Sequence, residues 1–155
     1  MILETEVVCL ETAAEILARK GSHVWSIGTD ASVFEAVRLM DEAGAGALVV
    51  LHGGRLVGMI SERDYARKVI LKGRSSRDTL VSEIMSAPAI VVGPEERVSD
   101  CLRLMTEMRI RHLPVVEDGA LLGVVSIGDL VNAVLSAQAA EMRHLKSYVA
   151  GNYPA

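Results

Sequence analysis

The sequence has few aromatic residues and no excess of basic charge, and both shortages narrow what the chain can be. One Phe, one Trp and three Tyr are present among 155 residues, although half of all residues are apolar. We therefore expect a core built from Val, Leu, Ile, Ala and Met. The formal net charge of −4 offers no basic surface to neutralise a phosphate backbone, so nucleic acid is not an expected partner.

Long hydrophobic runs are also missing. No apolar stretch reaches the length of a membrane-spanning helix, so a membrane is not an expected partner. The first residues carry Glu4 and Glu6 where a secretory signal has a basic segment. These features predict a cytoplasmic protein made of one ordinary domain or of two small units.

Residues with metal-binding or nucleophilic chemistry are scarce and scattered. Cys9 and Cys101 stand far apart among apolar neighbours, which favours two buried free thiols in a reducing compartment over a disulfide. The four histidines show no metal-ligand spacing, and no serine or cysteine has a base partner evident in the sequence. The segment GAGALV (44–49) lacks the third glycine of a dinucleotide-binding loop. We expect no metal site and no catalytic residue.

What the chain does contain is one unit that occurs twice. Residues 28–70 align with residues 93–135 without a gap, at a constant offset of 65 positions (123 − 58 = 65). GMISERD (58–64) and GVVSIGD (123–129) repeat the pattern Gly-x-x-Ser-x-x-Asp. An internal duplication of this kind predicts two similar structural units.

Each copy has the pattern of a β-α-β-β-α unit. A short extended segment precedes an amphipathic helix, and the first helix has Ser32 and Glu35 as a capping box and Gly44 as its stop. Two apolar strands joined by a tight turn follow, and then a second helix. The expected strands are residues 23–27, 47–51 and 56–60 in the first copy, and 89–92, 113–116 and 121–125 in the second.

One such unit is too small to bury its sheet alone. We therefore expect an α/β (α+β) fold in which two units pack with pseudo-two-fold symmetry. The expected division is an N-terminal helix (5–20) and the first repeat within 1–71, a polar linker over 72–79, the second repeat over 80–140, and the end of a C-terminal helix (130–148) with an irregular tail over 141–155.

The repeated motif can serve as a helix cap, as part of a binding site, or as both. Ser61 and Ser126, each followed by an acid three residues on, can simply cap the helices that begin there, at about 1 kcal/mol each. The same helix starts offer free backbone N–H groups to a phosphate. Asp64 and Asp129 add carboxylates that can accept from the vicinal hydroxyls of a ribose, as acidic residues do in dinucleotide-binding folds. The two roles do not exclude each other.

The duplicated motif, with RHLPVVE (111–117) in the second copy, resembles the cystathionine-β-synthase (CBS) domain family over roughly residues 12–140. Two CBS repeats in tandem form a Bateman module, and this chain resembles the stand-alone bacterial type. The resemblance implies two clefts between the repeats, each drawing on both copies. It also implies that the Ser and Asp of each motif hold the ribose of an adenosine-type ligand, and that the module forms a homodimer through its helices.

The resemblance assigns a set of residues to each cleft. Cleft A would consist of Ser61, Arg63, Asp64, Met85, Ile90, Ile110, Arg111, His112 and Pro114. Cleft B would consist of Ser126, Gly128, Asp129, Lys20, Trp25, Ala45, Gly46 and Ala47.

The two clefts are not expected to be equivalent. Arg111 and His112 lie where the family often places phosphate-binding residues, and together with Arg63 they make cleft A basic. The matching positions of the first copy are Gly46 and Ala47, which are small and neutral. We predict a phosphorylated nucleotide in cleft A and a weaker, larger or less charged ligand in cleft B. The alternatives are a solvated surface for the two arginines and packing at a dimer face for His112.

The expected function is that of a non-catalytic regulatory module that requires no cofactor. Candidate ligands are AMP, ADP, ATP, NAD and S-adenosylmethionine, and a bound ligand would shift the conformation and the affinity for a regulated partner protein. Two alternatives remain open. One is an interaction or stress-associated scaffold with vestigial clefts. The other is an enzyme acting on a bound nucleotide, for which only His112 qualifies as a base.

Overall fold

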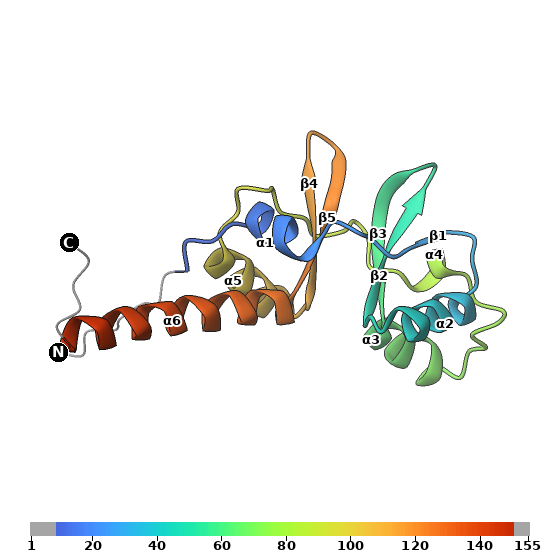
Figure 1. Cartoon of the computed structure of the whole chain (residues 1–155). Helices are drawn as coiled ribbons and strands as arrows, with labels where there is room; N and C mark the ends of the chain where they lie inside the picture. Colours follow the sequence, from blue (N-terminus) through green and yellow to red (C-terminus); the bar gives the residue numbers. More distant parts are fainter. Residues whose placement is uncertain (1–8, 151–155) are drawn as a thin grey trace.

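A computed structural model describes residues 9–150, and Figure 1 shows them as two α+β units joined side by side. The C-terminal tail expected over 151–155 and the start of the helix expected over 5–20 lie outside the described residues. The elements are α1 (Ala13–Lys20), β1 (Ser26–Gly28), α2 (Val33–Ala43), β2 (Ala47–His52), β3 (Arg55–Ser61), α3 (Glu62–Tyr65), the π-helix η1 (Ala66–Ile70), α4 (Val81–Ile84), α5 (Val98–Met108), β4 (His112–Glu117), β5 (Ala120–Ser126) and α6 (Ile127–Val149).

The two hairpins confirm the duplication. β2 pairs antiparallel with β3 from Ala47↔Ser61 onward, and β4 pairs with β5 from His112↔Ser126 onward, so the registers match at the offset of 65. The central residues of both turns have positive φ, for example 49° at Asp118 and 79° at Gly119. Two-residue hairpin loops favour this geometry because its twist matches that of the strands.

The strand that should open each repeat differs from the expectation. β1 begins three residues later than expected and pairs in parallel with β2. Residues 89–92 do not form a strand, and only an isolated parallel bridge joins Val92 to Val115. Pro88 and Pro94 bracket this segment, and a proline supplies no backbone N–H to a sheet. The second sheet therefore has two strands and the first has three.

The residues expected to cap α2 do so, whereas α1 and the helix after β3 differ from the expectation. The Ser32 hydroxyl accepts from the backbone N–H of Glu35, which is half of the expected capping box, and Gly44 ends α2 in the left-handed conformation. α1 begins only at Ala13, because Thr12 caps it, so the helix is shorter than the expected 5–20. In the first repeat, α3 passes into η1, whereas α6 continues for 23 residues.

The packing exchanges segments between the repeats. Ile16 and Leu17 of α1 belong to the buried cluster of the second repeat, together with residues of α5, β4, β5 and α6. Val81 and Ile84 of α4 belong to the buried cluster of the first repeat. Figure 1 shows α1 beside β5 and α5, and α4 beside β1 to β3. Each helix thus precedes one repeat in sequence and packs into the other.

This exchange also explains the glycine that begins each motif. A Cβ on Gly58 would lie 2.7 Å from the backbone oxygen of Ser86, and a Cβ on Gly123 would lie 2.7 Å from Cδ2 of Leu17. Separations below about 3 Å are not tolerated without movement. Glycine therefore allows Ser86 to approach the first hairpin at Gly58, and Leu17 to approach the second hairpin at Gly123.

Both cysteines are free thiols buried in the cluster of the second repeat, as expected. Burial, aided by Glu96 and Asp100, raises the pKa of the Cys101 thiol to about 11. No helix among residues 9–150 is long and apolar enough to cross a membrane.

Candidate functional site

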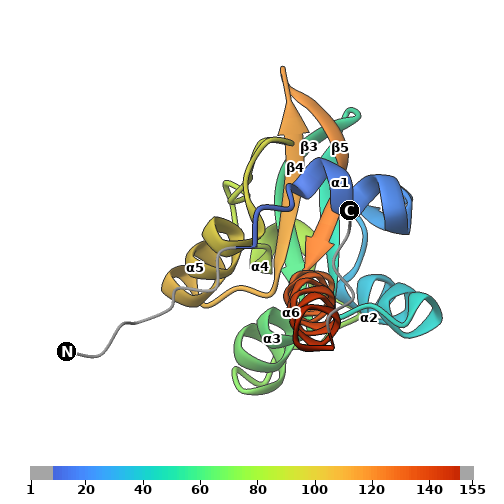
Figure 2. The same ribbon diagram turned by 60° about the vertical axis from the view of Figure 1, so that its left-hand side comes forward.

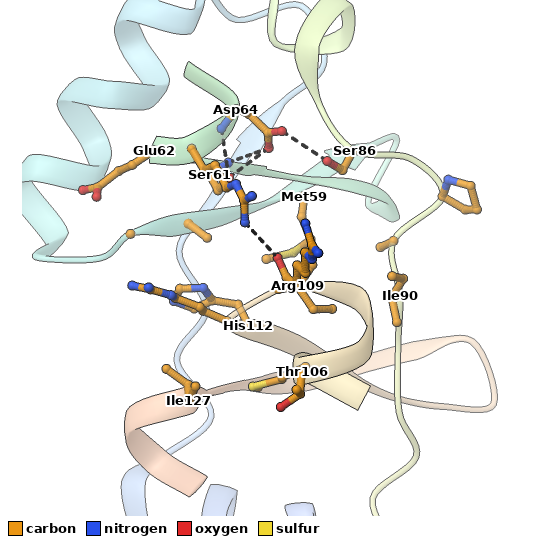
Figure 3. Close-up of a pocket in the computed structure, with 18 residues that line it drawn as sticks. Met59, Ser61, Glu62, Asp64, Ser86, Ile90, Thr106, Arg109, His112 and Ile127 are labelled. Atoms are coloured by element: carbon orange, nitrogen blue, oxygen red, sulfur yellow. Dashed lines mark hydrogen bonds between the residues drawn. The ribbon is translucent and has the colours of Figure 1, made fainter. Parts of the chain in front are cut away.

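Cleft A, the larger of the two predicted clefts, lies between the repeats and encloses about 680 Å³. Figure 3 shows Ser61, Asp64 and Ser86 on one side of it, and Thr106, Arg109 and His112 on the other. The lining residues are Gly46, Ala47, Met59, Ser61, Glu62, Arg63, Asp64, Ser86, Pro88, Ala89, Ile90, Met105, Thr106, Arg109, Ile110, Arg111, His112 and Ile127. The volume is in the range of small-molecule sites.

Ser61 and Asp64 form a complete capping box at the start of α3. The Ser61 hydroxyl oxygen accepts from the backbone N–H of Asp64 at 3.2 Å, and Oδ2 of Asp64 accepts from the backbone N–H of Ser61 at 3.0 Å. Ser126 and Asp129 make the same reciprocal pair at the start of α6. The capping role of both motifs is confirmed, and the ribose role stays a prediction.

The carboxylate of Asp64 is buried and has further partners. Its Oδ1 accepts from the Ser86 hydroxyl at 3.2 Å and pairs with Nζ of Lys68 at 3.0 Å. Lys68 also donates to the carbonyl of Ile84 at 2.8 Å. A ribose that used this carboxylate would share it with, or displace, the Ser86 hydroxyl, which also lines the cleft.

Three arginines from both repeats line cleft A. Arg109 and Arg111 come from the segment between α5 and β4, and Arg63 comes from α3. Nη1 of Arg63 lies 3.4 Å from the carbonyl oxygen of Arg109, so the two repeats meet here. Glu62 and Asp64 are the acidic lining residues, and both come from α3, on the Ser61 side of the cleft. Three guanidinium groups within one cavity favour an anionic ligand.

Arg109 was not among the residues predicted from the sequence. It ends α5 with φ 55° and ψ 45°, which is the left-handed region. The matching residue of the first repeat is Gly44, which has φ 63° and carries no Cβ to strain. A non-glycine residue in this region is uncommon and costs about 1 kcal/mol or more. Such strain often accompanies a functional role, and here the side chain lines the cleft.

Cleft B is smaller, at about 400 Å³, and lies on the other side of the same shared wall. Gly46, Ala47, Met59 and His112 line both cavities. Its lining residues are Lys20, Gly21, His23, Val24, Trp25, Ala43, Gly44, Ala45, Gly46, Ala47, Val49, Met59, His112, Val124 and Ser126. Trp25 is 43% exposed and meets the ring of His23 edge-on, with the centroids 4.8 Å apart.

The aspartate that the sequence assigns to cleft B, Asp129, already forms an ion pair with a lysine. Nζ of Lys20 lies 2.6 Å from Oδ2 of Asp129 and donates to the carbonyl of Val124 at 3.0 Å. Burial opposes ionisation of Asp129, but Lys20 and the backbone N–H of Ser126 outweigh it, so the pKa of this carboxyl lies below its ordinary value. The ion pair ties the end of α1 to the start of α6.

His112 stands in the wall that separates the two clefts. Its Cε1 would lie 3.7 Å from a Cβ on Gly46, so the imidazole packs against that glycine. Burial and the nearby charges of Lys20 and Arg111 lower the pKa of His112, against the opposing effect of Asp129 and Glu62. The lowered pKa favours the neutral imidazole, and charged groups of both clefts act on it.

The structure gathers most, but not all, of the predicted residues. Seven line cleft A: Ser61, Arg63, Asp64, Ile90, Ile110, Arg111 and His112. Six line cleft B: Lys20, Trp25, Ala45, Gly46, Ala47 and Ser126. Four do not line the cleft assigned to them: Met85, Pro114, Gly128 and Asp129.

The residues outside the linings have other contacts. Met85 packs against the first core, with its sulfur 3.1 Å from the position of a Cβ on Gly58. Pro114 is buried in β4, where its carbonyl accepts from Val92. Gly128 lies in the first turn of α6, and Asp129 contacts two lining residues of cleft B, Lys20 and Ser126. Among residues 9–150, no group of three or more His, Cys, Asp or Glu side chains is placed to hold a metal ion.

Comparison with known proteins defines the class. A model of the CBS domain matches residues 13–70 and again residues 81–136. The chain therefore belongs to the CBS domain family and is a tandem pair of CBS repeats, as the sequence predicted.

Individual relatives agree with this assignment. A mitochondrial CBS domain-containing protein of Arabidopsis thaliana is 45% identical over 138 residues, which is 86% of this chain and 66% of that relative. A CBS-domain protein of Burkholderia ambifaria is 46% identical, with a TM-score of 0.80 over 83% of this chain and 96% of that one. A hexameric CBS-CP12 protein of bloom-forming cyanobacteria is 35% identical, with a TM-score of 0.70 over 79% of this chain and 67% of that one.

Proposed function

We propose that this CBS pair is a non-catalytic regulatory module that binds an adenine nucleotide, with its phosphates in cleft A. The observation that carries the proposal is the composition of that cavity. The first repeat supplies a serine and a buried aspartate, and the second repeat supplies Arg109, Arg111 and His112 across about 680 Å³. Hydroxyl-binding and anion-binding groups on opposite walls suit a ribose phosphate.

The proposed mechanism is a linkage between the ligand and the arrangement of the repeats. A nucleotide in cleft A would touch Ser61 on one repeat and Arg111 on the other. It would therefore favour the relative orientation in which both contacts form, and it would shift the affinity for a regulated partner by the same free energy. This role requires no cofactor and no catalytic group, and we place the protein in the cytoplasm.

The first test is a titration of the purified protein with AMP, ADP, ATP, NAD and S-adenosylmethionine by isothermal calorimetry. We expect a phosphorylated nucleotide to bind cleft A, and Arg111→Ala to weaken this binding at least tenfold, because a charge-assisted hydrogen bond contributes about 1.5–3 kcal/mol. Asp129→Ala, which changes the partner of two lining residues of the other cleft, serves as the matched control and should leave the affinity for cleft A within about twofold. Two equal sites weakened alike by Arg111→Ala would contradict the proposal.

Cleft B is proposed to bind more weakly and to accept a less charged ligand. Its volume is smaller, its lining has one lysine and no arginine, and that lysine already pairs with Asp129. Trp25 offers a face for an aromatic base. Mass spectrometry of small molecules that co-purify with the protein, compared with Asp64→Ala and Asp129→Ala, identifies the ligand of each cleft.

A scaffold with vestigial clefts is the second candidate, and one observation favours it. Both motif aspartates already pair with lysines, so the carboxylates proposed to bind a ribose have partners within the protein itself. The hexameric CBS-CP12 relative is an assembled protein of similar fold. A thermal-shift panel separates the two functions, because a bound ligand stabilises the native state. If no adenine nucleotide raises the melting temperature, the scaffold is favoured.

A further inference from the structure

The C-terminal helix α6 carries an apolar stripe, interrupted at Gln138, that nothing in the described residues covers. Val131, Leu135, Met142, Leu145 and Val149 are between 43% and 86% exposed. Figure 1 shows α6 continuing past the rest of the second unit, and every residue from 136 to 149 is exposed. Such a row of large apolar side chains marks a surface for association.

The spacing of these residues is that of a coiled coil. They follow one another at intervals of four, seven, three and four positions. With Gln138 in the remaining place, they fill alternate first and fourth positions of a seven-residue repeat, so they form one stripe along the helix. Leu130 and Ala133, which are buried against the protein's own core, lie on a different face.

The projecting part of α6 also needs a partner to be stable. A helix of about four turns is marginal in water by itself, because most helical stability in proteins comes from packing of an apolar face. Figure 2 views α6 nearly end-on below β4 and β5, and Figure 1 shows its outer half extending past the other labelled elements. Its outer half therefore has room for a second helix along its length.

We propose that α6 pairs with α6 of a second copy as a parallel, in-register two-stranded coiled coil. Glu141 and Lys146 flank the stripe on opposite sides, five residues apart. In a parallel pair, residues at this spacing on the two chains face each other, so each glutamate meets a lysine of the other copy. In an antiparallel pair, the side of the stripe that carries Glu141 would face the same side of the other helix, and likewise for Lys146. Like charges would then face each other. The charges thus favour one partner, a second copy, and one orientation.

The first experiment measures the dimer dissociation constant of the full chain by sedimentation equilibrium. The double variant Met142→Glu/Leu145→Glu places charges in the stripe, and we expect it to weaken the dimer at least tenfold. The matched control, Ala140→Glu/Ser147→Glu, adds the same charge on the opposite face of the same helix and should dimerise like the original chain. A monomeric original chain, or a stripe variant that dimerises as tightly as the control, overturns the proposal.

The second experiment tests the orientation. Leu135→Cys and Val149→Cys lie two heptads apart, so in a parallel in-register pair each cysteine meets its own copy. Under diamide, both single variants should form disulfide-linked dimers, whereas Ser147→Cys, off the stripe, should not. An antiparallel pair can bring only one of the two positions against itself, so a dimer from one variant alone, or from neither, overturns the parallel arrangement. These readouts do not depend on whether a nucleotide binds.

Discussion

Arg109 combines backbone strain with a position in the wall of cleft A. Its counterpart, Gly44, shows that the position needs only a residue that accepts positive φ. We expect Arg109→Gly to raise the free energy of unfolding by up to about 1 kcal/mol, because glycine removes the strain and offsets this only in part by its greater freedom in the unfolded chain. The same variant should bind a phosphorylated nucleotide at least tenfold more weakly. Urea unfolding and calorimetry measure the two effects.

Arg109→Ala is the matched variant for this prediction. It removes the guanidinium but keeps a Cβ at φ 55°. It should therefore lose nucleotide affinity as Arg109→Gly does, without the gain in stability. Unchanged nucleotide affinity in both variants would mean that the residue serves only to end α5.

The pH response of His112 reports the charges of both clefts. Burial, then Lys20, lowers the pKa of this imidazole. The folded-state pKa therefore lies below the unfolded value of about 6.5, so the group contributes stability above that pH and loses it as the pH falls. An NMR titration should find the His112 pKa below 6.5 in the native protein.

The cause can be tested by substitution. Lys20→Met removes a positive charge and leaves Asp129 facing the ring, so the pKa of His112 should rise. Lys68→Met, which changes the lysine of the other aspartate, should leave it unchanged. A His112 pKa that is the same in the Lys20→Met variant and the original chain would show that Lys20 does not contribute to it.

At the residue scale, sequence reasoning found the duplicated groups and some unmatched ones, such as Lys20 and His112, but it missed Lys68 and Arg109. Ser61 and Ser126 lie one offset apart, and both caps form as expected. Lys20 and Lys68 each pair with a motif aspartate, but they are not 65 positions apart and reach the carboxylates from different elements. Arg109 could have been found, because a residue aligned with the stop glycine of α2 is expected to have positive φ.

At the scale of elements, the motif glycines allow α1 and the segment after α4 to pack closely against the hairpins. A Cβ at position 58 would meet a backbone oxygen of Ser86, which cannot move alone, and one at 123 would meet the end of the flexible Leu17 side chain. We expect Gly58→Ala to cost about 1–3 kcal/mol and Gly123→Ala to cost less. Urea unfolding of both variants measures the difference.

A double variant separates packing from backbone effects. Leu17→Ala removes the atoms that a Cβ on residue 123 would meet. In that background, Gly123→Ala should be close to neutral. An equal cost of Gly123→Ala in both backgrounds would assign the role of this glycine to the backbone conformation of β5.

The hairpins were the most predictable elements because their signals are local. Apolar runs and a turn that demands positive φ lie within about fifteen residues in each copy. The opening strands depend on pairing with β2 or β4, which are distant in the chain, and the prolines around 89–92 reduced the second one to a bridge. The π-helix η1 had no sequence signal, since the same positions of the second repeat are regular α-helix.

At the scale of the whole molecule, each core is built from segments that are not continuous in sequence. The duplication predicted two units with pseudo-two-fold symmetry, and the structure confirms this α+β architecture. It could not show that α1 and α4 are exchanged, because hydrophobic spacing marks a buried face without saying which core buries it. The exchange connects the units through the segments that follow α1 and α4, next to both clefts.

The exchange predicts where a core substitution acts. Ile16 precedes the first repeat in sequence but is buried in the core of the second. We expect Ile16→Ala to cost about 2–5 kcal/mol and, in hydrogen exchange, to reduce protection in β4, β5 and α5 more than in β2 and β3. Val81→Ala is the matched variant, since Val81 precedes the second repeat but is buried in the core of the first. It should reduce protection in β2, β3 and α2 instead, and the opposite pattern in either variant would contradict the exchange.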